Sequence, residues 1–253
     1  MNEYILELKN ICVSFPRKEF AVKNVSVSIK PNTITSVIGA AGAGKTTLLR
    51  AINRMHELYP DIKTSGEILL NEKNILTMNP AEVRRRIGMV FRSPNPFPAM
   101  DIYQNVLSGY MLNKIFLSKE EKDKVVEETL QEVGLWEEVK NRLNKKASEL
   151  NLGEQQRLCI ARCLALNPEI MLMDEPTYTL SGTCANRIEE LIYRIKNKMT
   201  IIIVTNQLLQ ASSISDYSMY MEKGELIEFD SCNKLFVNPK DKRTEKYITG
   251  QTD

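Results

Sequence analysis

The sequence predicts an α/β fold in which a helical segment is inserted between two parts built from strands and helices. Three short, largely apolar runs, residues 34–38, 169–173 and 200–204, have the length of buried parallel strands, and the last of them is rich in β-branched residues. A glycine-rich loop follows the first run, and acidic or amide residues follow the other two. Because α/β proteins place their ligands at the carboxyl ends of such strands, these three ends define the candidate site.

Other strands are indicated by alternating apolar and polar residues and by residues that favour turns. Residues 4–13 and 22–30 alternate apolar and polar side chains, as half-buried antiparallel strands do. Residues 66–71 and 87–91 are expected to form two more strands. In "YSMYMEKGELIEF", the pair Lys223-Gly224 predicts the turn of a hairpin, and the polar tail after it is expected to be helical.

The segment from about 95 to 166 has helical character. Ser118 followed three residues later by Glu121 forms a capping-box pattern, and apolar residues then recur on one helix face. "GEQQRLCIARCLAL" predicts a second amphipathic helix, in which two of the five cysteines of the chain are expected to lie in the core. A third helix is expected between the last two apolar strands, with one apolar face formed by Ile188, Leu191, Ile192 and Ile195.

Composition describes an ordinary soluble chain of 253 residues, 43% hydrophobic and 26% charged. The net charge of +2 gives no support for nucleic-acid binding. The basic run Arg84-Arg85-Arg86 has two open interpretations, a solvated helix face or a phosphate or carboxylate clamp within the fold. No apolar stretch reaches the roughly 18–20 residues of a membrane span, and the first residues do not resemble a signal peptide, so we expect a cytoplasmic chain.

The loop "GAAGAGKTT", residues 39–47, fits the pattern G-x-x-x-x-G-K-[ST] between a strand and a helix. Its glycines allow backbone amides to approach a phosphate chain closely. Lys45 supplies a positive charge for the outer phosphates, the Thr46 hydroxyl can ligate Mg²⁺, and the helix N-terminus favours an anion. The sequence therefore predicts a site for a nucleoside triphosphate.

The stretch "EIMLMDEP", residues 169–176, ends an apolar strand with two adjacent acids. Two carboxylates at such a position are costly unless a cation is present. We expect Asp174 to hold Mg²⁺ through water and Glu175 to orient or deprotonate an attacking water.

The phosphate loop is followed by the helical segment and then by "ELNLGEQQRLCIARCLALNPEIMLMDEPT", which includes the acidic motif. In this order of motifs the chain resembles an ATP-binding-cassette (ABC) nucleotide-binding domain over nearly its whole length. The stretches "RRRIGMVFRSPNPFPAMDIYQNV" and "NPKDKRTEKYITG" are similar to parts of the ATPase subunits of bacterial phosphate importers. A phosphate cargo is implied by this resemblance alone.

The resemblance implies a P-loop NTPase fold with a RecA-like core, an antiparallel β-subdomain and a helical subdomain. The single domain would place the core and β-subdomain in residues 1–92 and 167–253 and the helical subdomain in residues 93–166. It also implies ATP and Mg²⁺ as cofactors, dimerisation with an identical or a different cassette, and transmembrane permease subunits as partners. The chain would then lie on the inner face of the cell membrane.

The same resemblance implies a set of site residues. The nucleotide-binding set is Phe15, as the adenine-stacking aromatic, with Gly39, Ala40, Ala41, Gly42, Ala43, Gly44, Lys45, Thr46 and Thr47, and with Asn151 and Gly153 acting on the partner's nucleotide. The metal-binding pair is Thr46 and Asp174. The catalytic positions are Glu175, Asn206 and Arg92.

Several of these positions depart from the family pattern. Asn206 stands where the family has a histidine that contacts the γ-phosphate, and an amide has no titratable proton near neutral pH. Arg92 replaces a glutamine whose carbonyl ligates Mg²⁺; arginine has donors only and cannot ligate a metal. Arg92 could reach the γ-phosphate or point outward. The one histidine, His56, is expected on the solvated surface of the helix after the phosphate loop.

The family signature Leu-Ser-Gly-Gly-Gln is Leu150-Asn151-Leu152-Gly153-Glu154 in this chain. Leu152 is expected to hold the dimer faces apart or to tilt the loop, because its side chain replaces a glycine that approaches phosphate. Glu154 is an accepted variant. Ser181 replaces an aspartate that links the two sites of the dimer.

Two functional hypotheses follow, and both give the chain a role in transport. In the first, it is a hydrolysing ATPase subunit with reduced activity; in the second, it is a degenerate cassette that binds MgATP and serves as partner or regulator of an intact cassette. A soluble cassette of the DNA-repair or translation kind is disfavoured, because the chain has one cassette and no room for a coiled-coil insertion.

Overall fold

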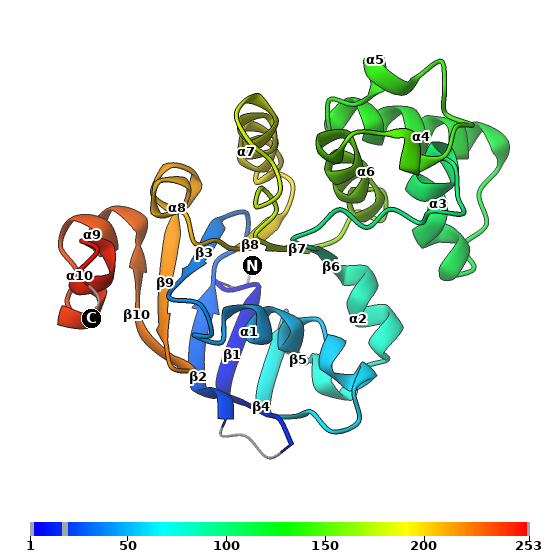
Figure 1. Ribbon diagram of the computed structural model, residues 1–253. Coiled ribbons are helices and arrows are strands. Elements are labelled where there is room, and N and C mark those ends of the chain that lie inside the picture. The colour runs from blue at the N-terminus through cyan, green and yellow to red at the C-terminus, as the bar shows by residue number, and fades with distance from the viewer. Residues whose placement is uncertain (1–2, 17–19, 252–253) are drawn as a thin grey trace. The chain divides into compact units, whose positions relative to one another are not determined.

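The structure is a computed structural model that describes residues 3–16 and 20–251 (Figure 1). The chain divides into two compact units, residues 1–84 with 196–253 and residues 85–195. Each unit combines parallel strands with helices, so the predicted α/β fold class is confirmed.

The first unit contains an antiparallel sheet in the order β2-β1-β4-β5. Its strands are β1 (Leu6–Ser14), β2 (Phe20–Ile29), β4 (Lys63–Leu70) and β5 (Lys73–Asn74). The alternation of the sequence explains the two longest strands, because their apolar side chains are buried on one face. The register of β1 shifts between Leu8 and Ile11, where Asn10 adopts a φ of 53°, as expected of a β-bulge.

The parallel strands of the first unit surround β3 (Ile34–Ile38), whose five residues are all buried. It pairs in parallel with β8 (Thr200–Val204) on one side and with β9 (Tyr217–Glu222) on the other. The predicted hairpin is confirmed: β10 (Glu225–Ser231) returns antiparallel to β9 after Lys223 and Gly224, which have φ values of 49° and 88°.

Helices of the first unit follow these strands. They are α1 (Lys45–Ile52), the 3-10 helices η1 (Met55–Leu58) and η2 (Ile75–Thr77), α8 (Leu208–Ile214), α9 (Cys232–Val237) and α10 (Lys242–Ile248). In Figure 1, α8 lies near β9, and α9 and α10 lie beside β10. A cluster of Ile38, Ala211, Tyr220 and Leu235 forms a core among β3, α8, β9 and α9. The expected helical tail is therefore confirmed.

The second unit pairs β6 (Ile87–Val90) in parallel with β7 (Ile170–Asp174). Its helices are α3 (Ile102–Leu112), α4 (Lys119–Glu132), α5 (Trp136–Val139), the 3-10 helix η3 (Ala147–Glu149), α6 (Leu152–Leu164) and α7 (Thr183–Ile195). The predicted capping box of Ser118 and Glu121 begins α4, and the four predicted apolar residues of α7 are buried. The subdomain boundaries at 93 and 166 stay a prediction.

The basic run lies at the end of α2 (Pro80–Arg86), and its three members behave differently. Arg84 donates to the backbone oxygen of Arg54, Arg85 is exposed, and Arg86 forms an ion pair with Glu169 at 2.5 Å. The run is therefore a structural clamp at two positions and a solvated residue at one.

None of the helices in the described ranges 3–16 and 20–251 has the length and apolar character needed to cross a membrane.

Candidate nucleotide site

The phosphate loop lies in the first unit, between the buried strand β3 and α1. Gly39, Gly42 and Gly44 have φ values of 147°, 79° and 96°, a region that favours glycine. A Cβ at Gly39 would lie 2.2 Å from the Met221 carbonyl oxygen, and one at Gly44 would lie 2.4 Å from the Ala21 carbonyl oxygen. Backbone of β9 and β2 therefore packs against the loop so closely that two of these positions exclude any side chain.

Lys45 begins α1, and its side chain is folded over the loop. Its Nζ donates to the carbonyl oxygens of Gly39 and Ala40 at 2.6 and 2.8 Å, and the residue is only 6% exposed. Gly44 at the N-cap has no side chain, so no N-cap side chain accepts from the amides of the first helical turn. The ammonium group and the helix N-terminus thus present positive charge at the same loop, as an anion site requires.

A C-terminal side chain, Tyr247 of α10, also contacts the phosphate loop. Burial raises the pKa of the Tyr247 phenol, and a hydrogen bond with the Gly39 backbone opposes this shift. Its ring stacks on Tyr220 of β9 with the centroids 4.9 Å apart. Sequence reasoning did not find Tyr247, because nothing in the local pattern of the tail relates it to a loop about 200 positions earlier.

Phe15 follows β1 and is half-buried. Its ring meets the ring of His56 edge to face, with the centroids 6.2 Å apart and an interplanar angle of 70°. The predicted adenine contact of Phe15 stays a prediction.

The prediction that His56 lies on the solvated surface of the helix after the loop is wrong. The helix α1 ends at Ile52, Arg54 adopts a left-handed φ of 60°, and the chain then turns the imidazole inward on η1. His56 is 3% exposed, and its Nδ1 has no hydrogen-bond partner among the residues that the structure describes. Burial, reinforced by the positive charge of Arg50, lowers the pKa of His56 from 6.5 to about 4.

The acidic pair lies in the second unit, at the carboxyl end of β7. Asp174 is the last residue of the strand and is 6% exposed, while Glu175 has a φ of 45°. A left-handed conformation is uncommon for glutamate and costs free energy.

Arg92, which follows β6, forms an ion pair with Glu175. The Arg92 Nε lies 3.3 Å from the Glu175 Oε2, and the guanidinium carbon lies 3.2 Å above the centroid of the Tyr178 ring. The Arg92 side chain is directed to the neighbouring carboxylate and not simply outward, and its contact with a γ-phosphate stays a prediction. Tyr178 was not among the predicted site residues, although an aromatic residue just after the acidic pair was a visible signal.

Asn206 lies in the first unit, two residues after the end of β8, and it is exposed. The Thr205 Oγ1 accepts from the backbone amide of Gln207 at 3.0 Å, which shapes the turn that presents the Asn206 side chain.

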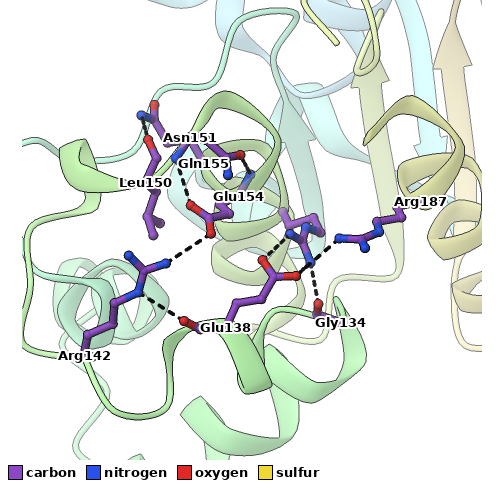
Figure 2. Close-up of polar contacts among 9 residues, drawn as sticks. Gly134, Glu138, Arg142, Leu150, Asn151, Glu154, Gln155 and Arg187 are labelled. Atoms are coloured by element: carbon purple, nitrogen blue, oxygen red, sulfur yellow. Dashed lines mark hydrogen bonds and ion pairs between the residues drawn. The ribbon is translucent and has the colours of Figure 1, made fainter. Parts of the chain in front are cut away.

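The signature segment begins α6, and Asn151 is its N-cap (Figure 2). The Asn151 Oδ1 accepts from the Glu154 amide at 3.0 Å, and the Glu154 carboxylate accepts from the Asn151 amide at 2.8 Å, which completes a capping box. Glu154 also pairs with Arg142 at 3.1 Å. Leu152 occupies the first helical position and is 53% exposed, whereas Gly153 packs so closely on Cys184 that an added Cβ would lie 3.2 Å from the sulfur.

An ion-pair cluster around Glu138 lies next to this segment (Figure 2). The Glu138 carboxylate accepts from Arg157 of α6 at 2.7 Å and pairs with Arg187 of α7 at 3.3 Å. Arg157 is nearly buried and also donates to the Gly134 carbonyl oxygen. Through these contacts α5, α6 and α7 share one carboxylate, so the helix that carries the signature is fixed on two sides.

Ser181 is exposed in the loop that precedes α7, and its carbonyl oxygen accepts from the Cys184 amide at 3.3 Å. The described residues contain no cluster of three or more His, Cys, Asp or Glu side chains that could hold a metal ion alone. The Thr46 hydroxyl of the first unit and the buried Asp174 carboxylate of the second unit are each an oxygen donor of the type that Mg²⁺ accepts.

Comparison with known proteins agrees with this description. The profile of the ABC transporter family matches residues 22–178. The "Phosphate import ATP-binding protein PstB" of Pyrobaculum aerophilum is 43% identical, with 97% of this chain and 98% of that protein covered. "Phosphate import ATP-binding protein PstB 2" of Streptococcus thermophilus is 45% identical, with 99% of both chains covered.

Solved structures show the same fold. The structure of cbiO1 from Clostridium perfringens, described as part of the ABC transporter complex cbiONQ, matches with a TM-score of 0.81 and 25% identity over 99% of this chain and 97% of that chain. A dimeric structure of the ATP-binding cassette MJ0796, bound to ADP and Pi, matches with a TM-score of 0.76 and 28% identity over 90% and 98%.

The strand-loop-helix phosphate site and the matching profile are those of the P-loop NTPase fold, whose ABC members bind ATP. The chain belongs to the ABC transporter family. Relatives named as phosphate import ATP-binding proteins cover it almost from end to end.

Proposed function

We propose that this chain is the ATP-binding subunit of an ABC importer for inorganic phosphate, and that it binds MgATP while hydrolysing it weakly. The printed names of relatives at 43–45% identity over nearly the whole chain support phosphate as the cargo. The observation that carries the proposal is a contrast. The phosphate loop is complete, with Lys45 held at its mouth, whereas Glu175 is engaged by Arg92.

ATP binding uses groups that the chain retains. The loop amides and Lys45 bind the phosphates, Thr46 and Asp174 hold Mg²⁺, and Phe15 stacks on the adenine. Mg²⁺ neutralises charge on the phosphate oxygens when it is bound. The remaining P-loop residues, Ala40, Ala41, Ala43 and Thr47, line the phosphate chain through their backbone or hydroxyl groups.

Weak hydrolysis follows from the residues that would position or deprotonate water. Arg92 cannot ligate a metal and is paired with Glu175, and Asn206 cannot carry a proton near neutral pH. A single lost general acid or base, or a lost charge-stabilising donor, costs a factor of roughly 10²–10³. These factors do not multiply, because the residues act as a unit.

Partners follow from the same family membership. We expect the chain to pair with a second cassette, identical or different, and to dock on permease subunits at the inner face of the membrane. In such a pair the Asn151 amide and Gly153 would face the partner's nucleotide, and Leu152, exposed at the helix start, would lie at the same surface.

A second candidate function is a non-hydrolysing cassette that supports or regulates an intact one. The exposed Leu152 and the Arg92–Glu175 ion pair favour it, because each affects a step after nucleotide binding. In a mixed pair, the site formed by the partner's phosphate loop and this chain's signature keeps the partner's catalytic set and is the one expected to turn over.

The test measures binding and turnover separately on the purified chain. Titration calorimetry with MgATP should give binding that the variant Lys45→Ala abolishes. Steady-state phosphate release should be about 0.01 per second or slower, two orders of magnitude below an ordinary enzyme rate of about 1 per second. Turnover near one per second would refute weak hydrolysis, and absence of MgATP binding would refute the proposed function itself.

A further inference from the structure

We infer that Arg92 and Tyr178 form a latch that holds the Glu175 carboxylate in an ion pair and prevents it from acting on water. The inference rests on the proposed ATP-binding function, because it concerns the acid expected to serve that site. The latch consists of Arg92 as the cation, Glu175 as the anion and Tyr178 as the residue that positions the cation.

The backbone brings the three residues together within the second unit. The Tyr178 amide donates to the Glu175 carbonyl oxygen at 3.0 Å, so the turn after β7 brings the aromatic ring back beside the carboxylate. The Gln156 amide nitrogen of α6 donates to the carbonyl oxygens of Phe91 and Pro176, at 3.1 and 3.0 Å. Gln156 is fully buried, and its two hydrogen bonds connect the segment that carries Arg92 to the segment that carries Glu175.

The ion pair places a cation next to one of the two carboxylate oxygens of Glu175, Oε2, which a base would use. The Glu175 side chain is 12% exposed, so its carboxylate has little access to bulk water. Arg92 stays protonated at every relevant pH and presents donors only. The guanidinium beside this oxygen competes with an attacking water for Glu175, so the carboxylate loses its availability as a base.

Tyr178 explains why Arg92 takes this orientation. The Arg92 side chain is 44% exposed and could extend into solvent, which is its usual preference. The Tyr178 ring lies under the guanidinium with 3.2 Å between the guanidinium carbon and the ring centroid, and the ring face attracts the cation. Tyr178 is therefore a positioning residue, because its ring acts on the Glu175 carboxylate through Arg92.

The contact itself is tested without nucleotide. In a double-mutant cycle, Arg92→Met and Tyr178→Ser are made singly and together, and the unfolding equilibrium constant is measured in urea. The latch predicts non-additivity of about two- to fivefold, the value of an exposed cation–π contact. Additive effects would overturn the latch, whatever the chain does with ATP.

The functional consequence is tested in a repaired chain, which carries Asn206→His, Asn151→Ser, Leu152→Gly and Ser181→Asp so that Glu175 limits the rate. In this chain Arg92→Met and Tyr178→Ser should each raise single-turnover ATP hydrolysis at least tenfold, and a further Glu175→Gln should remove the gain. Arg92→Met supplies no amide oxygen, so a gain cannot come from a restored metal ligand.

The matched control is Tyr178→Phe, which keeps the aromatic face and should keep the slow rate. Equal rates in the repaired chain with and without the latch substitutions would overturn the inference. A repaired chain that binds no MgATP would refute the proposed function instead, and the urea cycle would still decide whether the latch exists.

Discussion

Acidification should destabilise the fold through His56. The imidazole is buried, and its pKa falls from 6.5 to about 4 in the folded chain. Above pH 6.5 the imidazole is neutral in both states and the full stability is present. Between pH 6.5 and pH 4 the unfolded chain takes up a proton that the folded chain rejects, so stability is lost as the pH falls through this window.

The size of the effect follows from the shift. A difference of about 2.5 pH units at 1.36 kcal/mol per unit gives a loss of roughly 3 kcal/mol by pH 4. Below that pH, His56 is protonated in both states and contributes no further loss. For a domain with a typical stability of about 5–15 kcal/mol, a loss of this size is readily measured.

Two assays check this expectation, and each uses a residue type that occurs once in the sequence. His56 is the one histidine, so a single imidazole signal in NMR reports its titration, with an expected midpoint near pH 4. Urea unfolding followed by the fluorescence of Trp136, the one tryptophan, gives the free energy of unfolding at several pH values. The variant His56→Leu should lose stability less steeply than the wild type between pH 6.5 and pH 4.

The substitution also changes packing against Phe15, which alters stability by the same amount at every pH. Comparing how steeply the free energy of unfolding of the two chains changes with pH removes this constant effect. A midpoint near 6.5 in the folded protein, or parallel stability curves for the two chains, would refute the assignment of this acid sensitivity to a buried neutral imidazole.

Three further predictions concern the site and its support. Gly39→Ala should weaken MgATP binding by at least tenfold in calorimetry, because the new Cβ would lie 2.2 Å from the Met221 carbonyl oxygen. Gly42→Ala should weaken binding less, because a Cβ at that position has no heavy atom within 4 Å, and the reverse order would contradict the loop geometry. Asn151→Ala should lower the free energy of unfolding in urea by about 1 kcal/mol through loss of the N-cap, whereas Asn151→Ser should keep it. Equal losses in the two variants would show that the Asn151 side chain does not stabilise the helix as an N-cap. Glu138→Gln should cost about 1–2 kcal/mol, because Arg157 is left nearly buried with a weaker partner; an unchanged melting curve would show that the cluster contributes no stability.

Local patterns were sufficient to predict much of this molecule. Residues 34–38 and 200–204 form strands because continuous apolar runs must be buried on both faces. The phosphate loop was predicted because its glycines, Lys45 and the following helix are neighbours in the chain, so their chemistry is encoded within nine residues. The capping box at Ser118 and the turn at Lys223-Gly224 are equally local.

The sequence by itself thus determined the α/β class and the position of the phosphate loop. Only the tertiary structure decided where individual side chains point: Arg92 to Glu175, Glu154 to Arg142 and His56 into the core. The reason is physical. A strand or a cap depends on hydrogen bonds and burial among residues a few positions apart, whereas the partner of a long charged side chain depends on which distant segments the fold brings within a few ångströms.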